Sequence, residues 1–299
     1  MSAQKSPVDT TSSDKKAFTT PSFLEYKQVG KRIVVCTAYD YMQAQIVQAA
    51  GVDVILVGDS LGMTTLGHDS TLKVTMDDML RATAAVAKGA PNSYIIADMP
   101  FMSYQHSKSE GMRNAAAFVA QAGAHAIKVE GASLETLVFI EAVVDAGIPV
   151  VGHLGLTPQS INQLGGYYTQ AKETDEVVKL MTDVYDLISA GVSAIVLECV
   201  PAEVAAELRE MYAIPTIGIG SGINCDGEVQ VFHDLLGLSD FTPRHTKHYL
   251  KGAELLSNAL AEYVQEVRTG TFPTDLQSVS IDQKIVKDAR AESERDLFE

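Results

Sequence analysis

The chain has no tryptophan, only three cysteines and few basic residues. No apolar run approaches the ~20 residues that a membrane helix needs, so we expect no membrane partner. The cysteines are scattered and form neither a disulfide framework nor a CxxC metal motif, which favours a cytoplasmic location. With 23 Lys and Arg against 38 Asp and Glu, the formal charge is −15. This balance argues against nucleic acid as a partner.

The two ends of the chain differ in composition from its centre. Residues 1–21 are polar, and their start lacks the apolar core of a secretion signal and the arginines of a mitochondrial transit peptide. We expect a disordered N-terminal tail over 1–21, a catalytic domain over 22–272 and a charged C-terminal extension over 273–299. The stretch 165–176 is polar and glycine-rich, which is typical of a mobile loop.

One unit recurs along the chain: a helical stretch ends near a glycine, and a short apolar strand follows. Such glycines are Gly51, Gly89, Gly123, Gly147 and Gly191. Glycine just past a helix end adopts the left-handed conformation that other residues resist. Short strands rich in Val and Ile are typical of parallel sheets buried on both faces.

Eight such strands are predicted, with helices between most of them. They lie near 33–37, 54–58, 94–98, 126–130, 149–153, 194–198, 215–219 and 229–234. This count predicts an α/β fold of the (β/α)8 TIM barrel class. A doubly wound sheet is the alternative, but it usually carries a glycine-rich turn after its first strand, where this chain has TAYDYMQ.

Carboxylates lie at the carboxyl ends of four of the predicted strands. They are Asp59, Asp98, Glu130 and Glu198. One such acid alone is more often the N-cap of the next helix. In a parallel barrel, however, the strand ends meet at one mouth, where four carboxylates would repel one another. A bound cation removes this repulsion, and an all-oxygen set suits Mg²⁺.

Asp59, Asp98 and Glu130 are the predicted metal ligands, direct or through water, since they lie at the ends of three neighbouring strands. Lys128 shares a face with Glu130 and is interpreted as a cation for a substrate carboxylate or enolate, with a structural ion pair or a Schiff-base lysine left open. Glu198, across the mouth, is the predicted general base. His153 fits a structural role at least as well as a catalytic one.

At these residues the sequence resembles the ketopantoate hydroxymethyltransferase family. The resemblance covers about residues 22–272 and rests on TAYDY (37–41), VGDSLGM (57–63), GHDST (67–71), ADMPFMSY (97–104), KVEG (128–131), GHLGLTPQS (152–160), LECVP (197–201) and CDGEVQVFHDLLGL (225–238). It implies a barrel of the phosphoenolpyruvate/pyruvate type. It also implies transfer of a hydroxymethyl group from 5,10-methylenetetrahydrofolate to 3-methyl-2-oxobutanoate, which gives 2-dehydropantoate in pantothenate biosynthesis.

The resemblance also assigns roles to individual residues. Asp59 and Asp98 would bind Mg²⁺ and contact the keto acid. Ser60 and Lys128 would contact the keto acid only. Glu130 would serve the metal, and Glu198 would accept the proton that leaves when a Mg-stabilised enolate forms. Family members typically assemble as homodecamers.

The chain departs from the family pattern at Lys73, Ser221, His245 and Thr246, none of them a metal or base position. Three other functions stay open: a metal-dependent lyase or decarboxylase that uses no folate, a Schiff-base aldolase acting through Lys128, and a non-catalytic keto-acid sensor.

Overall fold

The computed structural model describes residues 17–239 and 243–296. Eight strands form a closed barrel in the order β1 to β8, and each pairs in parallel with its sequence neighbours. The strands are β1 (Ile33–Thr37), β2 (Val54–Val57), β3 (Tyr94–Asp98), β4 (Ala126–Glu130), β5 (Val150–Gly155), β6 (Ala194–Glu198), β7 (Thr216–Ile219) and β8 (Gly227–Gln230). The predicted TIM barrel is confirmed.

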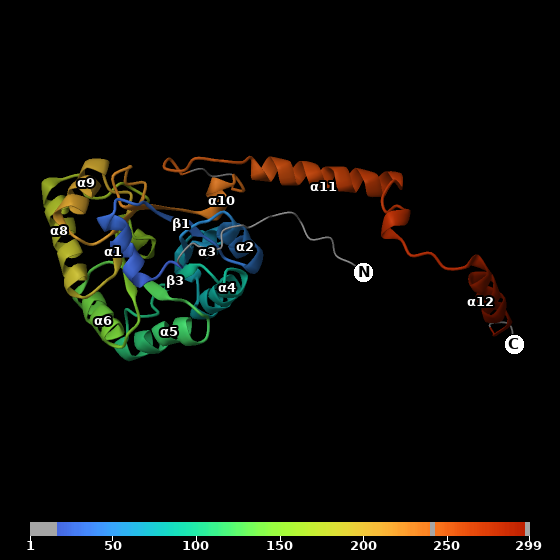
Figure 1. Cartoon of the computed structure of the whole chain (residues 1–299), viewed down its shortest axis with the longest axis horizontal. Helices are drawn as coiled ribbons and strands as arrows, with labels where there is room; N and C mark the ends of the chain where they lie inside the picture. Colours follow the sequence, from blue (N-terminus) through green and yellow to red (C-terminus); the bar gives the residue numbers. More distant parts are fainter. Residues whose placement is uncertain (1–16, 240–242, 297–299) are drawn as a thin grey trace. The chain divides into compact units, whose positions relative to one another are not determined.

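Helices surround the barrel and connect its strands (Figure 1). The helices of the barrel unit are α1 (Thr20–Gln28), α2 (Tyr41–Ala49), α3 (Leu61–Thr64), α4 (Met76–Gly89), α5 (Lys108–Ala120), α6 (Leu134–Asp145), α7 (Ile161–Leu164), α8 (Thr174–Ser189), α9 (Ala202–Met211) and α10 (Phe232–Leu235), with short 3-10 turns η1 (Thr71–Lys73) and η2 (Pro158–Ser160). The capping box predicted for the clearest helix is present, because Thr75 and Asp78 exchange hydrogen bonds at the start of α4.

Strand alternation divides the core into two layers. Side chains that point outward pack against the helices, among them Ile55, Ile127 and Ile195. Side chains that point inward fill the barrel, and Phe23 of α1 packs among them. Because Phe23 contacts the ring of Tyr94, the first residue of β3, α1 covers the N-terminal end of the barrel. The opposite, carboxyl end is left for a site.

Four of the five predicted glycines have a positive φ, as expected for chain reversal after a helix; they are Gly51, Gly123, Gly147 and Gly191. Gly89 is the exception, since it is the last residue of α4. A Cβ there would lie 2.4 Å from the carbonyl oxygen of Tyr41, so close packing of α4 against α2 requires this glycine.

The last strand differs from its predicted range of 229–234. The structure places β8 at Gly227–Gln230 and starts a short helix at Phe232. The N–H of Phe232 donates to Thr37 Oγ1 at 3.0 Å, which ends the strand pairing after Gln230. The apolar residues that resembled a longer strand therefore belong to α10.

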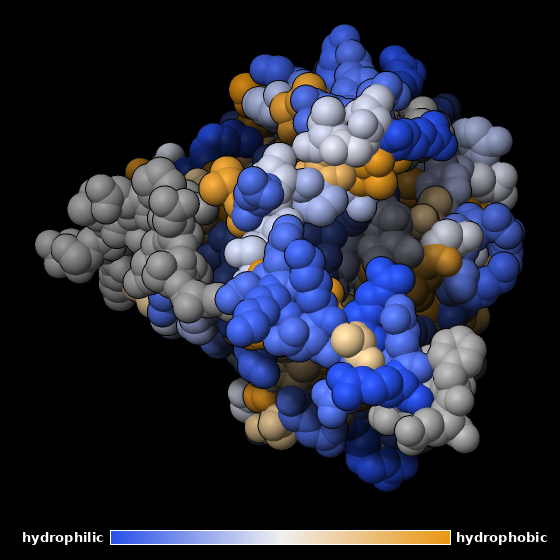
Figure 2. All heavy atoms as spheres, turned by 90° about the vertical axis from the view of Figure 1, so that its right-hand side faces the viewer, coloured by the Kyte–Doolittle hydropathy of each residue, from blue (hydrophilic) through white to orange (hydrophobic). Residues whose placement is uncertain are grey.

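The chain divides into two compact units, the second comprising Lys251–Glu299. This second unit contains α11 (Gly252–Thr269), η3 (Asp275–Gln277) and α12 (Gln283–Asp296). Among the described residues, no helix has both the length and the apolar composition that crossing a bilayer requires. Hydrophilic residues dominate the face shown in Figure 2, with only small hydrophobic patches.

Candidate active site

The inward-facing positions of four neighbouring strands carry polar side chains at their carboxyl ends. Alternation from Ile96, Val151 and Val196, which line the barrel, turns Asp98, His153 and Glu198 inward as well. Strand register then aligns the cluster: Asp98 pairs with Lys128, and Glu130 pairs with His153. Sequence positions spread over 100 residues therefore meet at one rim.

Asp59 and Ser60 join the cluster from the loop after β2. The backbone N–H of Asp59 donates to Asp98 Oδ2 at 3.1 Å, and Ser60 Oγ lies 2.8 Å from the hydroxyl of Tyr39. A Cβ on Gly58 would lie 2.8 Å from Ser60 Oγ and 3.5 Å from Asp98 Oδ2. Glycine at position 58 thus permits the close approach of the β2 loop to β3.

Gln159 connects the carboxylates to one another. Its side-chain amide donates to Asp59 Oδ2 at 2.9 Å, and its backbone N–H donates to Glu130 Oε2 at 2.9 Å. The structure therefore brings Asp59, Asp98 and Glu130 into one hydrogen-bonded network. Gln159 was not identified from the sequence, although it lies in the GHLGLTPQS motif.

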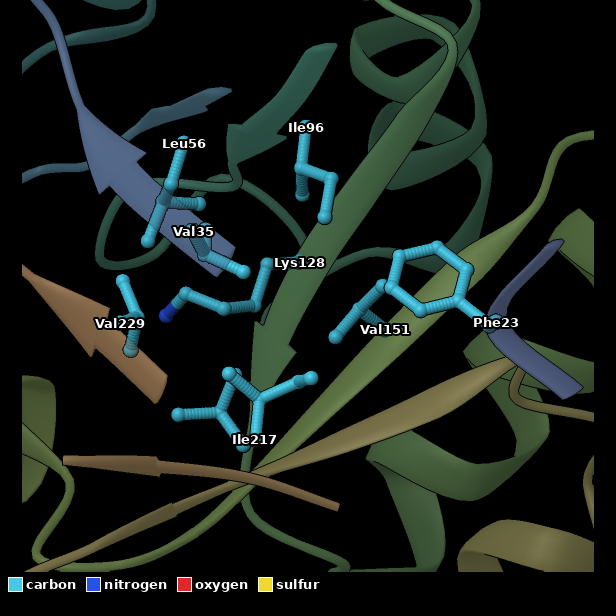
Figure 3. A pocket seen from close by; sticks show the side chains of 9 residues that line it. Phe23, Val35, Leu56, Ile96, Lys128, Val151, Ile217 and Val229 are labelled. Atoms are coloured by element: carbon cyan, nitrogen blue, oxygen red, sulfur yellow. The ribbon is translucent and has the colours of Figure 1, made fainter. Parts of the chain in front are cut away.

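Lys128 adds a positive charge to this network, and it is 4% exposed. Its Nζ lies 3.2 Å from Asp98 Oδ1 and 3.1 Å from His153 Nδ1. Figure 3 shows Lys128 extending from β4 into the barrel interior among apolar side chains such as Val35, Leu56 and Val229. The adjoining void is about 10 Å³, so hydration of the ammonium is minimal and Asp98 supplies its counter-charge.

His153 lies between Glu130 and Glu198, the predicted base. Its Nδ1 is 3.3 Å from Glu130 Oε1, and its Nε2 is 3.3 Å from Glu198 Oε2. The second contact lacks the alignment of a hydrogen bond, so Nε2 is buried without a hydrogen-bond partner among the described residues. The sequence left the role of His153 open, and the structure places it at the centre of the cluster.

Burial and mutual repulsion shape the electrostatics of the acids. Burial raises the pKa of Asp59 well above its usual value, and the charges of Asp98 and Glu130 add to this effect. Burial also raises the pKa of Asp98, although Lys128 opposes the shift. Burial would raise the pKa of Glu130 too, but His153, the charge of Lys128 and the N–H of Gln159 together outweigh burial, and the net shift is downward.

The ammonium of Lys128 is held in its charged form. Burial alone would lower its pKa, but the charges of Asp98, Glu130 and Asp59 outweigh burial and raise it. A Schiff-base nucleophile must be a neutral amine, so this environment is unfavourable to the aldolase alternative.

The oxygen-rich rim offers partial support for a metal site. Within the described ranges, no three His, Cys, Asp or Glu side chains are arranged to hold an ion together. Asp59 and Asp98 are adjacent, however, and within the described residues Asp98 Oδ1 is buried with the ammonium of Lys128, 3.2 Å away, as its polar neighbour. Two carboxylates with waters and substrate oxygens would suit Mg²⁺, which retains several waters when bound.

Hydrogen bonds from the loop before α8 and from the segment after β7 hold the chain on both sides of Glu198. The N–H of Gln170, in the polar loop before α8, donates to the carbonyl oxygen of Cys199 at 2.9 Å. Ser221 Oγ donates to the carbonyl oxygen of Leu197 at 2.8 Å and accepts from the N–H of Val200 at 3.1 Å. The strand end that carries Glu198 is therefore held on both sides of the residue.

This combination of fold and rim defines a class of protein. A closed parallel barrel with its acids, lysine and histidine gathered at the carboxyl ends of the strands is the arrangement of a TIM-barrel enzyme.

Comparison with known proteins identifies the family. The profile of the ketopantoate hydroxymethyltransferase family matches residues 17–275. A 3-methyl-2-oxobutanoate hydroxymethyltransferase of Acetivibrio thermocellus is 50% identical over 270 residues, which cover 90% of this chain and 95% of that protein. The enzyme of the same name from Carboxydothermus hydrogenoformans is 48% identical, and the match covers 90% of this chain and 98% of that protein. The chain belongs to the ketopantoate hydroxymethyltransferase family and is an enzyme.

Solved structures place the barrel among related folds. Phosphonopyruvate hydrolase in complex with oxalate and Mg²⁺ superposes with a TM-score of 0.57 at 13% identity, covering 94% of this chain and 98% of that one. A 2,3-dimethylmalate lyase of the PEP mutase/isocitrate lyase superfamily superposes with a TM-score of 0.54 at 15% identity. The match covers 92% of this chain and 100% of that one. At these identities the likeness concerns the fold alone, and it agrees with the TIM barrel.

Proposed function

We propose that the chain transfers a hydroxymethyl group from 5,10-methylenetetrahydrofolate to 3-methyl-2-oxobutanoate, giving 2-dehydropantoate and tetrahydrofolate with consumption of one water. The observation that carries this is the rim itself: a base, a cation and two adjacent carboxylates share one site in a chain 50% identical to an enzyme of that name.

Each polar side chain has a part in the proposed reaction. Lys128, fixed by Asp98 and His153, binds the substrate carboxylate, and Ser60 donates to the keto acid beside it. Glu198 removes the proton from C3, which makes that carbon a nucleophile. Water releases the one-carbon unit from both folate nitrogens at the oxidation level of formaldehyde, so tetrahydrofolate leaves. The carbon nucleophile adds to this unit, and the oxygen of the water becomes the new hydroxyl group. Because Nδ1 of His153 accepts from Lys128, its proton lies on Nε2, which faces Glu198 Oε2 at 3.3 Å and so holds the base in place.

Asp59 and Asp98 would hold a divalent cation, and Glu130 would serve the same ion directly or through water. When bound, it would supply Lewis-acid stabilisation of negative charge on the substrate. We further propose Mg²⁺ as that cation, and a homo-oligomer of the homodecamer type as the assembled enzyme.

Turnover of the purified chain tests the proposal. Product should form from 3-methyl-2-oxobutanoate only when methylenetetrahydrofolate is present, stop in EDTA and return with added Mg²⁺. Product formation without the folate would instead support a lyase or decarboxylase. Tight keto-acid binding with no turnover under any condition would support a sensor.

A further inference from the structure

A second polar cavity lies at the opposite end of the barrel from the acid cluster. It has a volume of about 240 Å³. Its lining includes Asp226, which directly precedes β8 and whose carboxylate binds the N–H of Thr216, the first residue of β7, at 3.0 Å. Both residues mark the N-terminal ends of their strands. A ligand here would therefore not compete with substrate at the mouth.

The cavity is positive although the protein is strongly negative. Four cationic side chains and a single carboxylate line it, namely Lys27, Lys31, Arg32, Arg209 and Asp226. Their formal sum is +3, in a chain whose net charge is −15. Glu228, outside the lining, interacts with Arg32 and lowers this local excess. Cys225 adds no charge, because burial raises the pKa of its thiol to about 11.

An internal network neutralises Asp226 and fixes two of the cations. Lys27 Nζ donates to Asp226 Oδ2 at 3.0 Å and to the carbonyl oxygens of Arg209 and Ile214, both at 2.9 Å. These three bonds use all the donors of the ammonium. Arg209 Nε donates to Asp226 Oδ1 at 2.7 Å, and the side chain of Asp226 is 1% exposed. Lys27 therefore contributes positive charge to the cavity but no free hydrogen-bond donor. The carboxylate of Asp226 is already paired with two cations.

The remaining donors are available to a ligand. Only Nε of Arg209 is used within the described residues, so its two Nη groups are free while Asp226 holds the guanidinium in place. Arg32 is positioned by one bond, from Nη1 to the carbonyl oxygen of Ile223 at 2.6 Å. Lys31 Nζ lies 3.8 Å from the ring centroid of Tyr26, and its ammonium donors are unpaired among the described residues.

We propose that this cavity is a binding site for a small polyanion of the phosphate class. Two pre-positioned guanidinium groups present planar donor pairs that match phosphate oxygens, and the ammonium adds a third direction of approach. The volume suits a compact ligand such as a diphosphate group and is below the ~300–1,000 Å³ range of drug-sized ligands. The proposal does not depend on the proposed reaction.

Binding of inorganic pyrophosphate tests the site. The full chain is titrated with pyrophosphate, without divalent ions, by calorimetry and by thermal unfolding. The controls are citrate and sodium chloride at matched ionic strength. Pyrophosphate should bind in a one-to-one ratio and raise the Tm. Equal stabilisation by sodium chloride would overturn the proposal, and tighter binding of citrate would overturn the phosphate class.

Variants locate the binding. Arg32→Gln should weaken pyrophosphate binding roughly 10–100-fold, the loss expected for a charged hydrogen bond. Lys31→Gln, which breaks no side-chain hydrogen bond among the described residues, keeps the test valid if Arg32→Gln disturbs the loop at Ile223. Arg81→Gln, on the exposed face of α4, is the matched control and should bind as the unmodified chain does. Unchanged affinity in both cavity variants would place the anion elsewhere and refute the site.

Discussion

The identity of Glu198 as the base can be tested at the level of one side chain. Glu198→Gln keeps the size of the residue and removes its ability to accept a proton. We expect normal folding, retained keto-acid binding and a loss of turnover of ~10²–10⁴-fold, the usual contribution of general base catalysis. The measurement is kcat together with exchange of solvent deuterium into C3. Exchange at the unmodified rate in the variant would show that another group removes the proton.

Ser221 is one of the departures from the family pattern, and the structure gives it a specific role. It bonds to Leu197 and Val200 on either side of Glu198, and it is 1% exposed. Ser221→Ala would leave the buried N–H of Val200 unpaired, at a cost of about 1–3 kcal/mol in stability.

If Ser221 positions the base, Ser221→Ala should also lower kcat several-fold and leave the KM for the keto acid unchanged. A loss of stability with unaltered kcat would show a purely structural role. Ser189→Ala is the matched control, because Ser189 Oγ bonds only to its own helix, at the carbonyl oxygen of Tyr185. That variant should change neither quantity.

Asp59 links stability to pH. Its pKa is raised in the folded chain, so its stabilising contribution is complete below the ordinary carboxyl pKa of about 4 and is lost as pH rises through the folded value. The metal-free chain should therefore have a lower Tm at pH 8 than at pH 5. His153, whose pKa is also raised, contributes in the same direction.

The variant Asp59→Asn separates the contribution of Asp59 to the pH dependence of stability from that of His153. It removes a buried charge, so in EDTA it should raise the Tm at pH 8 and flatten the pH dependence. The same change should reduce turnover by ~10²-fold or more if the carboxylate holds a catalytic metal. Added Mg²⁺ should raise the Tm of the unmodified chain at pH 8 and leave that of the variant unchanged. An equal response of both proteins would remove Asp59 from the metal site.

At the scale of elements, the cap of α4 is a local feature that the sequence predicts and the structure confirms. Thr75→Ala would remove the acceptor for the N–H of Asp78 and should cost about 0.5–2 kcal/mol in the free energy of unfolding. Because α4 lies outside the barrel, kcat should not change. Thr182→Ala is the control, since Thr182 only back-bonds to Val178 on α8 and caps nothing. Chemical denaturation would measure both.

Elements and their order could be read from the sequence because each depends on local chemistry. Apolar runs and glycine turns located seven strands to within about two residues, and strand ends located Asp98, Lys128 and Glu198. Gln159 could not be found this way, since the two carboxylates that it binds lie 29 and 100 positions away. The position of His153 between two acids, likewise, depends on the register of three strands, which no single segment specifies.

At the scale of the whole molecule, one helix of the second unit carries a row of exposed apolar side chains. Along α11, side chains of Leu, Tyr and Val are 40–64% exposed; they are Leu255, Leu256, Leu260, Tyr263, Val264 and Val267. The spacing of residues 256, 260, 263 and 267 places them on one face of the helix. A contiguous apolar face of this kind marks an interaction site, which supports the proposed homo-oligomer.

Disruption of this face should therefore change the mass of the particle rather than the fold of the barrel. Leu260→Asp inserts a charge into the apolar stripe and should convert the oligomer to smaller species in light scattering coupled to size exclusion. Asn258→Asp adds the same charge to the same helix, away from residues 256, 260, 263 and 267, and should leave the mass unchanged. If the unmodified chain runs as a monomer, or if both variants keep its mass, α11 is not the contact between copies. Retained circular dichroism in Leu260→Asp would show that the loss of mass comes from the interface, because the barrel unit carries its own core.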